Sequence, residues 1–131
     1  MHTHHSYRLR IYYEDTDHSG MVYHANYLRY MERAREHVLD PDWLVTLWER
    51  DGIGFVVYKA ELTYREPARF GDELDVRTTV HRESAWRAVF HQDVWRVGGA
   101  SPLVEGRIHL VAVGRDGKLV KLPDAVTSTA V

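Results

Sequence analysis

Cysteine is absent from the 131 residues of the chain. Disulfide bonds, thiolate metal sites and a cysteine nucleophile are therefore excluded. A chain without cysteine fits the reducing cytoplasm, which is the location we expect. No apolar run approaches the roughly 20 residues that a membrane-spanning helix needs. The segment Met1–His5 lacks the apolar core of a secretory signal, and its histidines are expected in a solvated chain end, with a metal site or a tag as alternatives.

An excess of basic charge is also lacking. Seventeen Lys and Arg face nineteen Asp and Glu, for a formal net charge of -2. Nothing in this balance indicates a nucleic acid as partner. Hydrophobic residues make up 44% and charged residues 27%, which is typical of a globular protein. The length predicts one domain over residues 1–131, and chains of this size often gain stability by forming oligomers.

Hydrophobic periodicity predicts a strand, two helices and four further strands. Alternating apolar residues indicate a first strand over 7–13, followed by a polar loop over 14–21. Helical spacing then runs from about Val22 to Leu39 and ends before Pro41, because proline disfavours helical backbone in the residue before it. A shorter helix is predicted over 43–50. The four later strands are predicted at about 53–65, 74–80, 86–97 and 104–112.

The connections after residue 65 are short, so neighbouring strands there are antiparallel. The pattern predicts an α+β domain in which the long helix covers the apolar face of a curved sheet of about five strands. Val56, Tyr58 and Leu62 are expected on the packed face of the strand over 53–65. Glu32 is expected to pair with Arg29 or Arg35 on the surface of the helix.

One polar segment, from Tyr13 to Tyr27, carries the residues that suggest chemistry. Asp15 and Asp17 come just before the long helix, whose expected start near His24 lacks a good capping residue. Unpaired amides at a helix start, assisted by the helix dipole, suit an anion or a developing oxyanion. A carboxylate beside them can attack a bound carbonyl or activate water toward it.

Other interpretations of this segment stay open. Asp15 and Asp17 also suit a loop in which they accept hydrogen bonds from backbone amides. The set Asp15, Asp17, His18 and His24 consists of residue types that bind metals, although its spacing is a weak pattern for a metal site. Asn26 is a suitable cap if the helix begins later than His24. Tyr23 is more often a packing residue than part of a site.

Longer motifs around these residues resemble those of a known family. The motifs are Tyr13-Glu14-Asp15-Thr16-Asp17, Gly20-Met21-Val22-Tyr23-His24, Glu32-Arg33-Ala34-Arg35 and, later, Pro67-Ala68-Arg69. Together they resemble the 4-hydroxybenzoyl-CoA thioesterase family, and more narrowly its YbgC-type branch. The resemblance covers roughly residues 7 to 122, and the first motif is the most specific.

This resemblance implies a hot-dog fold, in which a curved antiparallel sheet wraps a long helix. It implies hydrolysis of an acyl-CoA, or of an acyl group on an acyl carrier protein, without a metal or a cofactor. Asp17 matches the family's catalytic aspartate, as nucleophile or general base. The backbone N–H of His24 matches the group that polarises the thioester carbonyl, and Tyr23 helps to shape the site. The active site is expected at the interface of a homodimer, which often assembles further into a homotetramer.

Two basic residues, Arg82 and Arg87, are candidates for contacts with the coenzyme A phosphates, although isolated basic residues on strands usually face water. A non-catalytic module that binds acyl-CoA or an acyl carrier is an alternative function, since fold does not settle function. A metal-dependent hydrolase that uses Asp15, Asp17 and His24 is a third. The sequence does not select the acyl group, and Phe55 is a candidate for lining its pocket.

Overall fold

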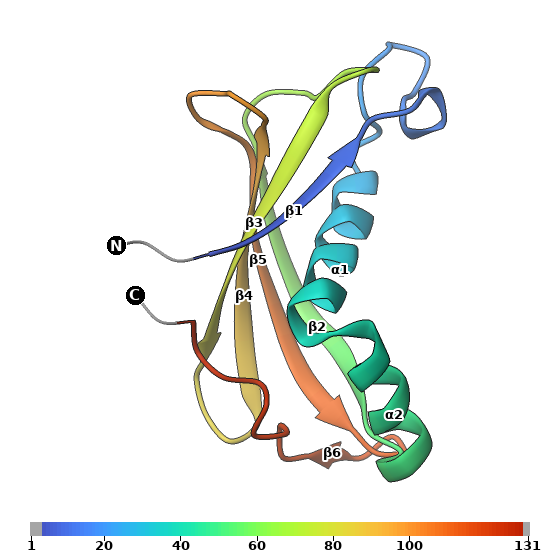
Figure 1. Cartoon of the computed structure of the whole chain (residues 1–131), viewed down its shortest axis with the longest axis vertical. Helices are drawn as coiled ribbons and strands as arrows, with labels where there is room; N and C mark the ends of the chain where they lie inside the picture. Colours follow the sequence, from blue (N-terminus) through green and yellow to red (C-terminus); the bar gives the residue numbers. More distant parts are fainter. Residues whose placement is uncertain (1–3, 130–131) are drawn as a thin grey trace.

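A curved antiparallel sheet wraps one long helix in the computed structural model, which describes residues 4–129 (Figure 1). The strands follow the order β1-β3-β4-β5-β2, and β6 pairs with β5. This arrangement confirms the predicted α+β architecture, with one additional two-residue strand. The elements are β1 (His5–Arg10), the 3₁₀ helix η1 (Tyr13–Asp15), α1 (Asn26–Leu39), α2 (Pro41–Asp51), β2 (Gly54–Tyr64), β3 (Glu73–Arg82), β4 (Arg87–Arg96), β5 (Pro102–Val113) and β6 (Leu119–Val120).

The core lies between α1 and the concave face of the sheet (Figure 1). The helix buries one stripe at helical spacing, as predicted, formed by Tyr27, Tyr30, Met31 and Ala34. The inward residues of β3, β4 and β5 recur at every second position, because successive side chains in a strand point to opposite faces. These inward residues include Leu74, Val76, Phe90, Val94, Val104 and Ile108.

A buried polar network joins α1 to the sheet, and the sequence patterns did not indicate it. Gln92 on β4 is fully buried and donates from Nε2 to the Met31 carbonyl at 2.8 Å and to Thr78 Oγ1 at 3.0 Å. Its Oε1 accepts a hydrogen bond from Arg35 at 3.1 Å. Arg35 continues the helical stripe one turn beyond Met31 and is 9% exposed. A buried polar group costs little only when it is hydrogen-bonded, so this network also fixes where α1 sits.

Several predicted boundaries were wrong. The first strand ends at Arg10, because the chain turns at Ile11 and Tyr13–Asp15 forms η1. Helix α1 begins at Asn26, two to four residues later than expected, because His24 and Ala25 form a turn. At the N-terminus, Met1–Thr3 lie outside the described residues. His5 pairs with Thr78 of β3 and so belongs to the sheet, contrary to the solvated end that we expected.

The prediction for β2 was also wrong in one respect. Its residues from Val56 to Glu61 are all exposed, and Tyr58, expected on the packed face, is 47% exposed. The pairing with β5 shifts register between Val57 and Lys59, which breaks the alternation of inward and outward positions. In addition, β2 is the last strand of the sheet and has a neighbour on one side only. Periodicity alone cannot distinguish such an edge strand from a central one.

Candidate active site

A small hairpin ahead of α1 carries the acidic segment. Thr16 and Val22 form a bridge across it, and the Asp17 N–H donates to the Met21 carbonyl at 2.9 Å. A second bridge joins Met21 to Arg69, and the Val22 N–H donates to the Ala68 carbonyl at 2.9 Å. The turn after β2 therefore supports the hairpin from one side, as the upper end of Figure 1 shows. This explains why the two motifs, far apart in the sequence, form one site.

The carboxylate of Asp17 is exposed and held in place by one neighbour. Its Oδ1 accepts hydrogen bonds from the Ser19 hydroxyl and from the Ser19 N–H, the latter at 2.9 Å. These two bonds, with smaller contributions from His18 and His24, lower the pKa of Asp17 below its usual value. Within residues 4–129, Oδ2 has no hydrogen-bond partner. Asp17 is therefore ionised at neutral pH and has one oxygen available for a substrate or a water molecule.

Ser19 was not among the predicted site residues. The signal that was available is the spacing Asp-x-Ser, in which an aspartate accepts from the backbone two residues later. The other acid, Asp15, has a structural role. Its Oδ2 accepts from the Tyr12 N–H at 2.8 Å, and its carbonyl accepts from the Tyr23 N–H at 3.0 Å and from the Asn26 side chain at 2.8 Å. The loop interpretation thus holds for Asp15, and Asn26 braces the loop instead of capping α1.

The backbone before α1 presents donors that lack acceptors. Ala25 occupies the cap position and makes no side-chain capping bond. In the described part of the chain, the N–H of His24 has no acceptor. The His24 carbonyl is fixed by a hydrogen bond from the Tyr64 hydroxyl at 3.0 Å. The His24 amide therefore precedes the helix by two residues, and it remains an unpaired donor on a braced turn.

Asp17 and His24 line one hollow of about 340 Å³. Tyr27, Tyr64 and Arg65 form further parts of its wall. A second hollow of about 400 Å³ also has Asp17 in its wall, together with His18 and Phe70. Tyr23 lines neither hollow. Its ring is half exposed and lies against the His24 ring, with 4.6 Å between the centroids, so it can act on the site only through His24.

The side chains suggested as metal ligands are not arranged around a common point in residues 4–129. The Asp15 carboxylate is engaged with Tyr12. Across residues 4–129, no three His, Cys, Asp or Glu side chains are placed so that they could hold an ion. Glu32 also departs from expectation, since it forms an ion pair with neither Arg29 nor Arg35 among the described contacts. Its side chain instead lines a cavity beside α2.

Arg82 and Arg87 lie at the opposite end of the sheet from Asp17. Arg82 ends β3, whereas the acidic hairpin lies near the start of that strand. The Arg82 guanidinium donates to the carbonyls of Leu122 at 3.0 Å and of Pro123 and Val126 at 2.9 Å. These hydrogen bonds hold the C-terminal segment against the sheet. Contacts with the coenzyme A phosphates stay a prediction for these two residues. The hydrogen bonds of Arg82 argue against such a contact for Arg82, because its donors are already used.

Replacing Arg82 with alanine should lower the free energy of unfolding by about 2–3 kcal/mol, because hydrogen bonds from a charged donor are worth about 1.5–3 kcal/mol each and some of these carbonyls will find water instead. Chemical denaturation measures the loss. Arg87→Ala is the matched control, since Arg87 is exposed and its ion pair with Glu83 spans 4.0 Å. Equal stability of the two variants would show that the hydrogen bonds from Arg82 to the C-terminal segment do not stabilise the fold.

Comparison with known proteins supplies an independent line of evidence. Residues 12–129 match the family model described as the thioesterase-like superfamily. An acyl-CoA thioesterase YbgC from Helicobacter pylori is 37% identical over 94 residues, which are 72% of this chain and 69% of that one.

Solved structures agree with this match. A probable thioesterase from Bartonella henselae has a TM-score of 0.83 at 31% identity, over 92% of this chain and 100% of that one. A 1,4-dihydroxy-2-naphthoyl-CoA thioesterase from Synechocystis has a TM-score of 0.85 at 25% identity, over 94% and 92%. These neighbours confirm the predicted hot-dog fold. Among residues 4–129, no helix is long and apolar enough to cross a bilayer.

Proposed function

Because this chain belongs to the thioesterase-like superfamily, and within it to the YbgC-type thioesterases, we propose that it hydrolyses the thioester of an acyl-CoA to a carboxylic acid and free coenzyme A. The observation that carries the proposal is that the ionised Asp17 and His24, whose N–H is unpaired, line the same hollow. Thioester hydrolysis needs one base or nucleophile and one oxyanion donor. An acyl carrier protein is an alternative bearer of the same thioester.

The chemistry that we propose uses these two groups. With Asp17 as general base, its carboxylate takes a proton from water while the water oxygen bonds to the thioester carbon. With Asp17 as nucleophile, the carboxylate oxygen forms that bond, and water then cleaves the resulting anhydride. In both routes the negative charge on the carbonyl oxygen is stabilised by the His24 N–H, and the C–S bond breaks to release the thiolate, which takes up a proton.

The test is thiol release from a panel of acyl-CoAs, including acetyl, butyryl, octanoyl, benzoyl and succinyl groups. Release from at least one substrate supports the proposal, and the panel ranks the acyl groups. If none is cleaved by protein that is folded and binds acyl-CoA tightly, the non-catalytic binding module becomes the better interpretation. We place the reaction in the cytoplasm, which the lack of cysteine allows.

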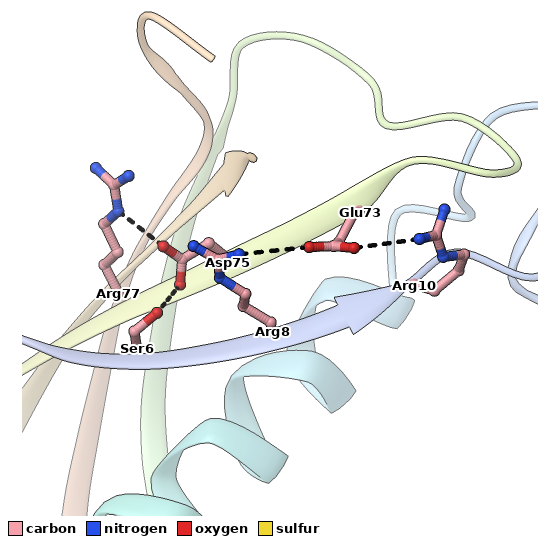
Figure 2. A network of polar contacts seen from close by, with 6 residues as sticks. All are labelled: Ser6, Arg8, Arg10, Glu73, Asp75 and Arg77. Carbon is pink, nitrogen blue, oxygen red and sulfur yellow. Dashed lines mark hydrogen bonds and ion pairs between the residues drawn. The ribbon is translucent and has the colours of Figure 1, made fainter. Parts of the chain in front are cut away.

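We further propose that the protein is a homodimer that pairs through β2. The two edges of the sheet differ strongly. The β1 edge is six residues long and polar. The Glu73 carboxylate lies 3.6 Å from Arg8 Nη1 and 3.1 Å from Arg10 Nη2. The Asp75 carboxylate accepts a hydrogen bond from the Ser6 hydroxyl and pairs with Arg77 (Figure 2). Charged side chains of this kind discourage further strand pairing.

The β2 edge is 11 residues long and exposes Val56, Val57 and Tyr58 to between 41% and 47%. The same edge also carries the exposed ion pair between Lys59 Nζ and Glu61 Oε1 at 3.8 Å. Its length, its apolar half and its unpaired backbone groups make it a template for another strand. A second copy of β2, antiparallel to the first about a two-fold axis, covers it in a closed assembly. We also propose that two such dimers pair further into a homotetramer.

Introducing a charge at the centre of this edge should separate the dimer. In Ala60→Glu, each copy places a new negative charge on the shared edge close to the two-fold axis, and the repulsion between the two copies disfavours association. Light scattering should show half the wild-type mass at micromolar concentration. Ala100→Glu, in the exposed turn after β4, is the matched control and should keep the wild-type mass. An unchanged mass for Ala60→Glu would exclude β2 as the interface.

A further inference from the structure

The turn before α1 is attached to the end of β2 by a single side chain. Tyr64, the last residue of β2, donates from its hydroxyl to the His24 carbonyl at 3.0 Å. The peptide group that carries the His24 N–H is held separately, because its carbonyl, from Tyr23, accepts from the Asn26 N–H at 2.9 Å. Hydrogen bonds therefore fix the peptide groups on both sides of the His24 Cα. The bond from Asn26 is local, whereas the bond from Tyr64 comes from the sheet.

The ring of Tyr64 packs against two other rings. The centroids of Tyr64 and Tyr27 are 5.8 Å apart with 61° between the planes, an edge-to-face contact that aromatic pairs favour. Tyr27 lies on α1 and is 2% exposed, so it gives Tyr64 a fixed support. The His24 ring meets Tyr64 edge-on, with 6.3 Å between the centroids. Burial raises the pKa of Tyr64 above its usual value, so the hydroxyl keeps its proton and remains a donor at neutral pH.

Tyr27 connects this pair of rings to the segment that carries the acid. Its hydroxyl accepts from the Ala68 N–H at 3.0 Å. The Ala68 carbonyl in turn accepts from the Val22 N–H at 2.9 Å. Val22 forms one side of the hairpin that carries Asp17. Contacts therefore run without a break from Tyr64, which holds the donor side of the site, to the hairpin that holds the acid.

The proposed reaction depends on the placement of both groups. Asp17 acts at the carbon of the thioester carbonyl and the His24 N–H acts at its oxygen, so the two must stay at a fixed separation. An oxyanion donor is effective only when it already points to the place where negative charge develops. A displacement of about 1 Å can lower the rate by about 10²-fold. Because His24 precedes α1, the helix does not set the direction of its N–H, and the bonds to the turn must do so.

We propose, on the basis of the thioesterase function above, that Tyr64 is a positioning residue for this reaction, whose hydroxyl orients the turn at His24 so that its N–H faces the thioester carbonyl. Tyr64 acts through the His24 backbone and not on the reacting atoms. Its ring forms part of the wall of the hollow that holds Asp17, and that contribution does not need the hydroxyl. Loss of the hydroxyl alone therefore slows the chemical step and leaves substrate binding unchanged.

Tyr64→Phe tests this role, because phenylalanine keeps the ring and removes only the donor. kcat should fall by roughly tenfold, while KM and the affinity for a non-hydrolysable thioether analogue stay within about twofold of the wild-type values. Tm should stay close to that of the wild type, since the Tyr64 side chain is 48% exposed. Tyr58→Phe is the matched control. Tyr58 lies on the same strand, is 47% exposed and makes no hydrogen bond from its hydroxyl within residues 4–129, so kcat should not change.

The amide of His24 can also be observed directly. In protein labelled with nitrogen-15, its N–H gives one resonance whose position depends on the orientation and the surroundings of the peptide group. Tyr64→Phe should shift this resonance, and Tyr58→Phe should leave it in place. Resonances of the sheet far from His24 should stay unchanged in both variants. A His24 resonance that does not move in Tyr64→Phe would show that the hydroxyl does not orient the amide, which overturns the proposal.

The outcomes separate this proposal from the function on which it rests. Wild-type protein that releases no thiol from any acyl-CoA contradicts the thioesterase function itself. Active wild type with an unchanged kcat in Tyr64→Phe overturns the positioning role and leaves the thioesterase function in place. A variant that loses kcat together with Tm, or together with affinity for the thioether analogue, also overturns that role, because the hydroxyl would then act on the fold or on substrate binding.

Discussion

Asp17→Asn should reduce kcat for acyl-CoA hydrolysis by roughly 10²-fold or more, as expected when a general base or nucleophile is lost. Asparagine keeps the size of the side chain and an oxygen that can accept from Ser19, so the hairpin should remain intact. Its amide can neither accept a proton from water nor attack the thioester. Initial rates of thiol release with saturating substrate measure the effect.

The stability of Asp17→Asn should stay close to that of the wild type, since Asp17 is exposed. Asp124→Asn, at an exposed position near the C-terminus, is the matched control and should keep full turnover. Retention of full activity by Asp17→Asn would exclude both catalytic roles and remove the main residue assignment. Incorporation of labelled oxygen from water into Asp17 during a single turnover would identify the nucleophile route over the general-base route.

Gly106→Ala should lower the free energy of unfolding by about 1–3 kcal/mol, the usual cost of forcing an extra methyl group into a packed core. A Cβ at Gly106 would lie 2.7 Å from Met31 Cε and 2.9 Å from the Gln92 carbonyl oxygen. The end of Met31 can move, but the carbonyl belongs to the paired strand β4 and cannot move without straining the sheet. Glycine at position 106 therefore leaves the space that the end of the Met31 side chain fills.

Thermal and chemical denaturation both report this loss, and Tm should fall by roughly 3–10 °C for a chain of this length. Gly54→Ala is the matched control. Its Cβ meets only the Trp48 ring at ordinary contact distance, so its stability should change little. If Gly106→Ala were as stable as Gly54→Ala, the space that Gly106 leaves for Met31 would not be a packing constraint.

Much of the fold was predictable from periodicity alone. The spacing of Tyr27, Tyr30, Met31 and Ala34 identified the buried stripe of α1, and the alternation in β3, β4 and β5 identified their inward faces. Both patterns depend on geometry that repeats within one element, so the sequence suffices to reveal them. Boundaries were less accurate at η1, which is closed by hydrogen bonds between Tyr12 and Asp15. They were also less accurate at the start of α1, where the distant Tyr64 holds the His24 carbonyl.

Some parts of the site were predictable from the sequence, and others were not. The motif placed Asp17 and His24 in one short segment, and the resemblance gave them roles. The motif did not indicate that Ser19 holds the Asp17 carboxylate, or that Tyr64, 40 residues after His24, fixes the backbone beside it. Arg82 shows the same limit, because a basic residue with no local partner in the sequence donates to three backbone carbonyls of the C-terminal segment in the fold.

The sequence by itself therefore determined the elements, the apolar faces and the segment that carries the acid, because each depends on neighbours within a few residues. Tertiary structure alone decided that the His24 N–H stays unpaired and that the Arg82 guanidinium is bound to backbone carbonyls. It also decided how Gln92 anchors α1 and which side of β2 has no neighbouring strand. Those features depend on contacts between residues far apart in the chain, and local periodicity carries no information about such contacts.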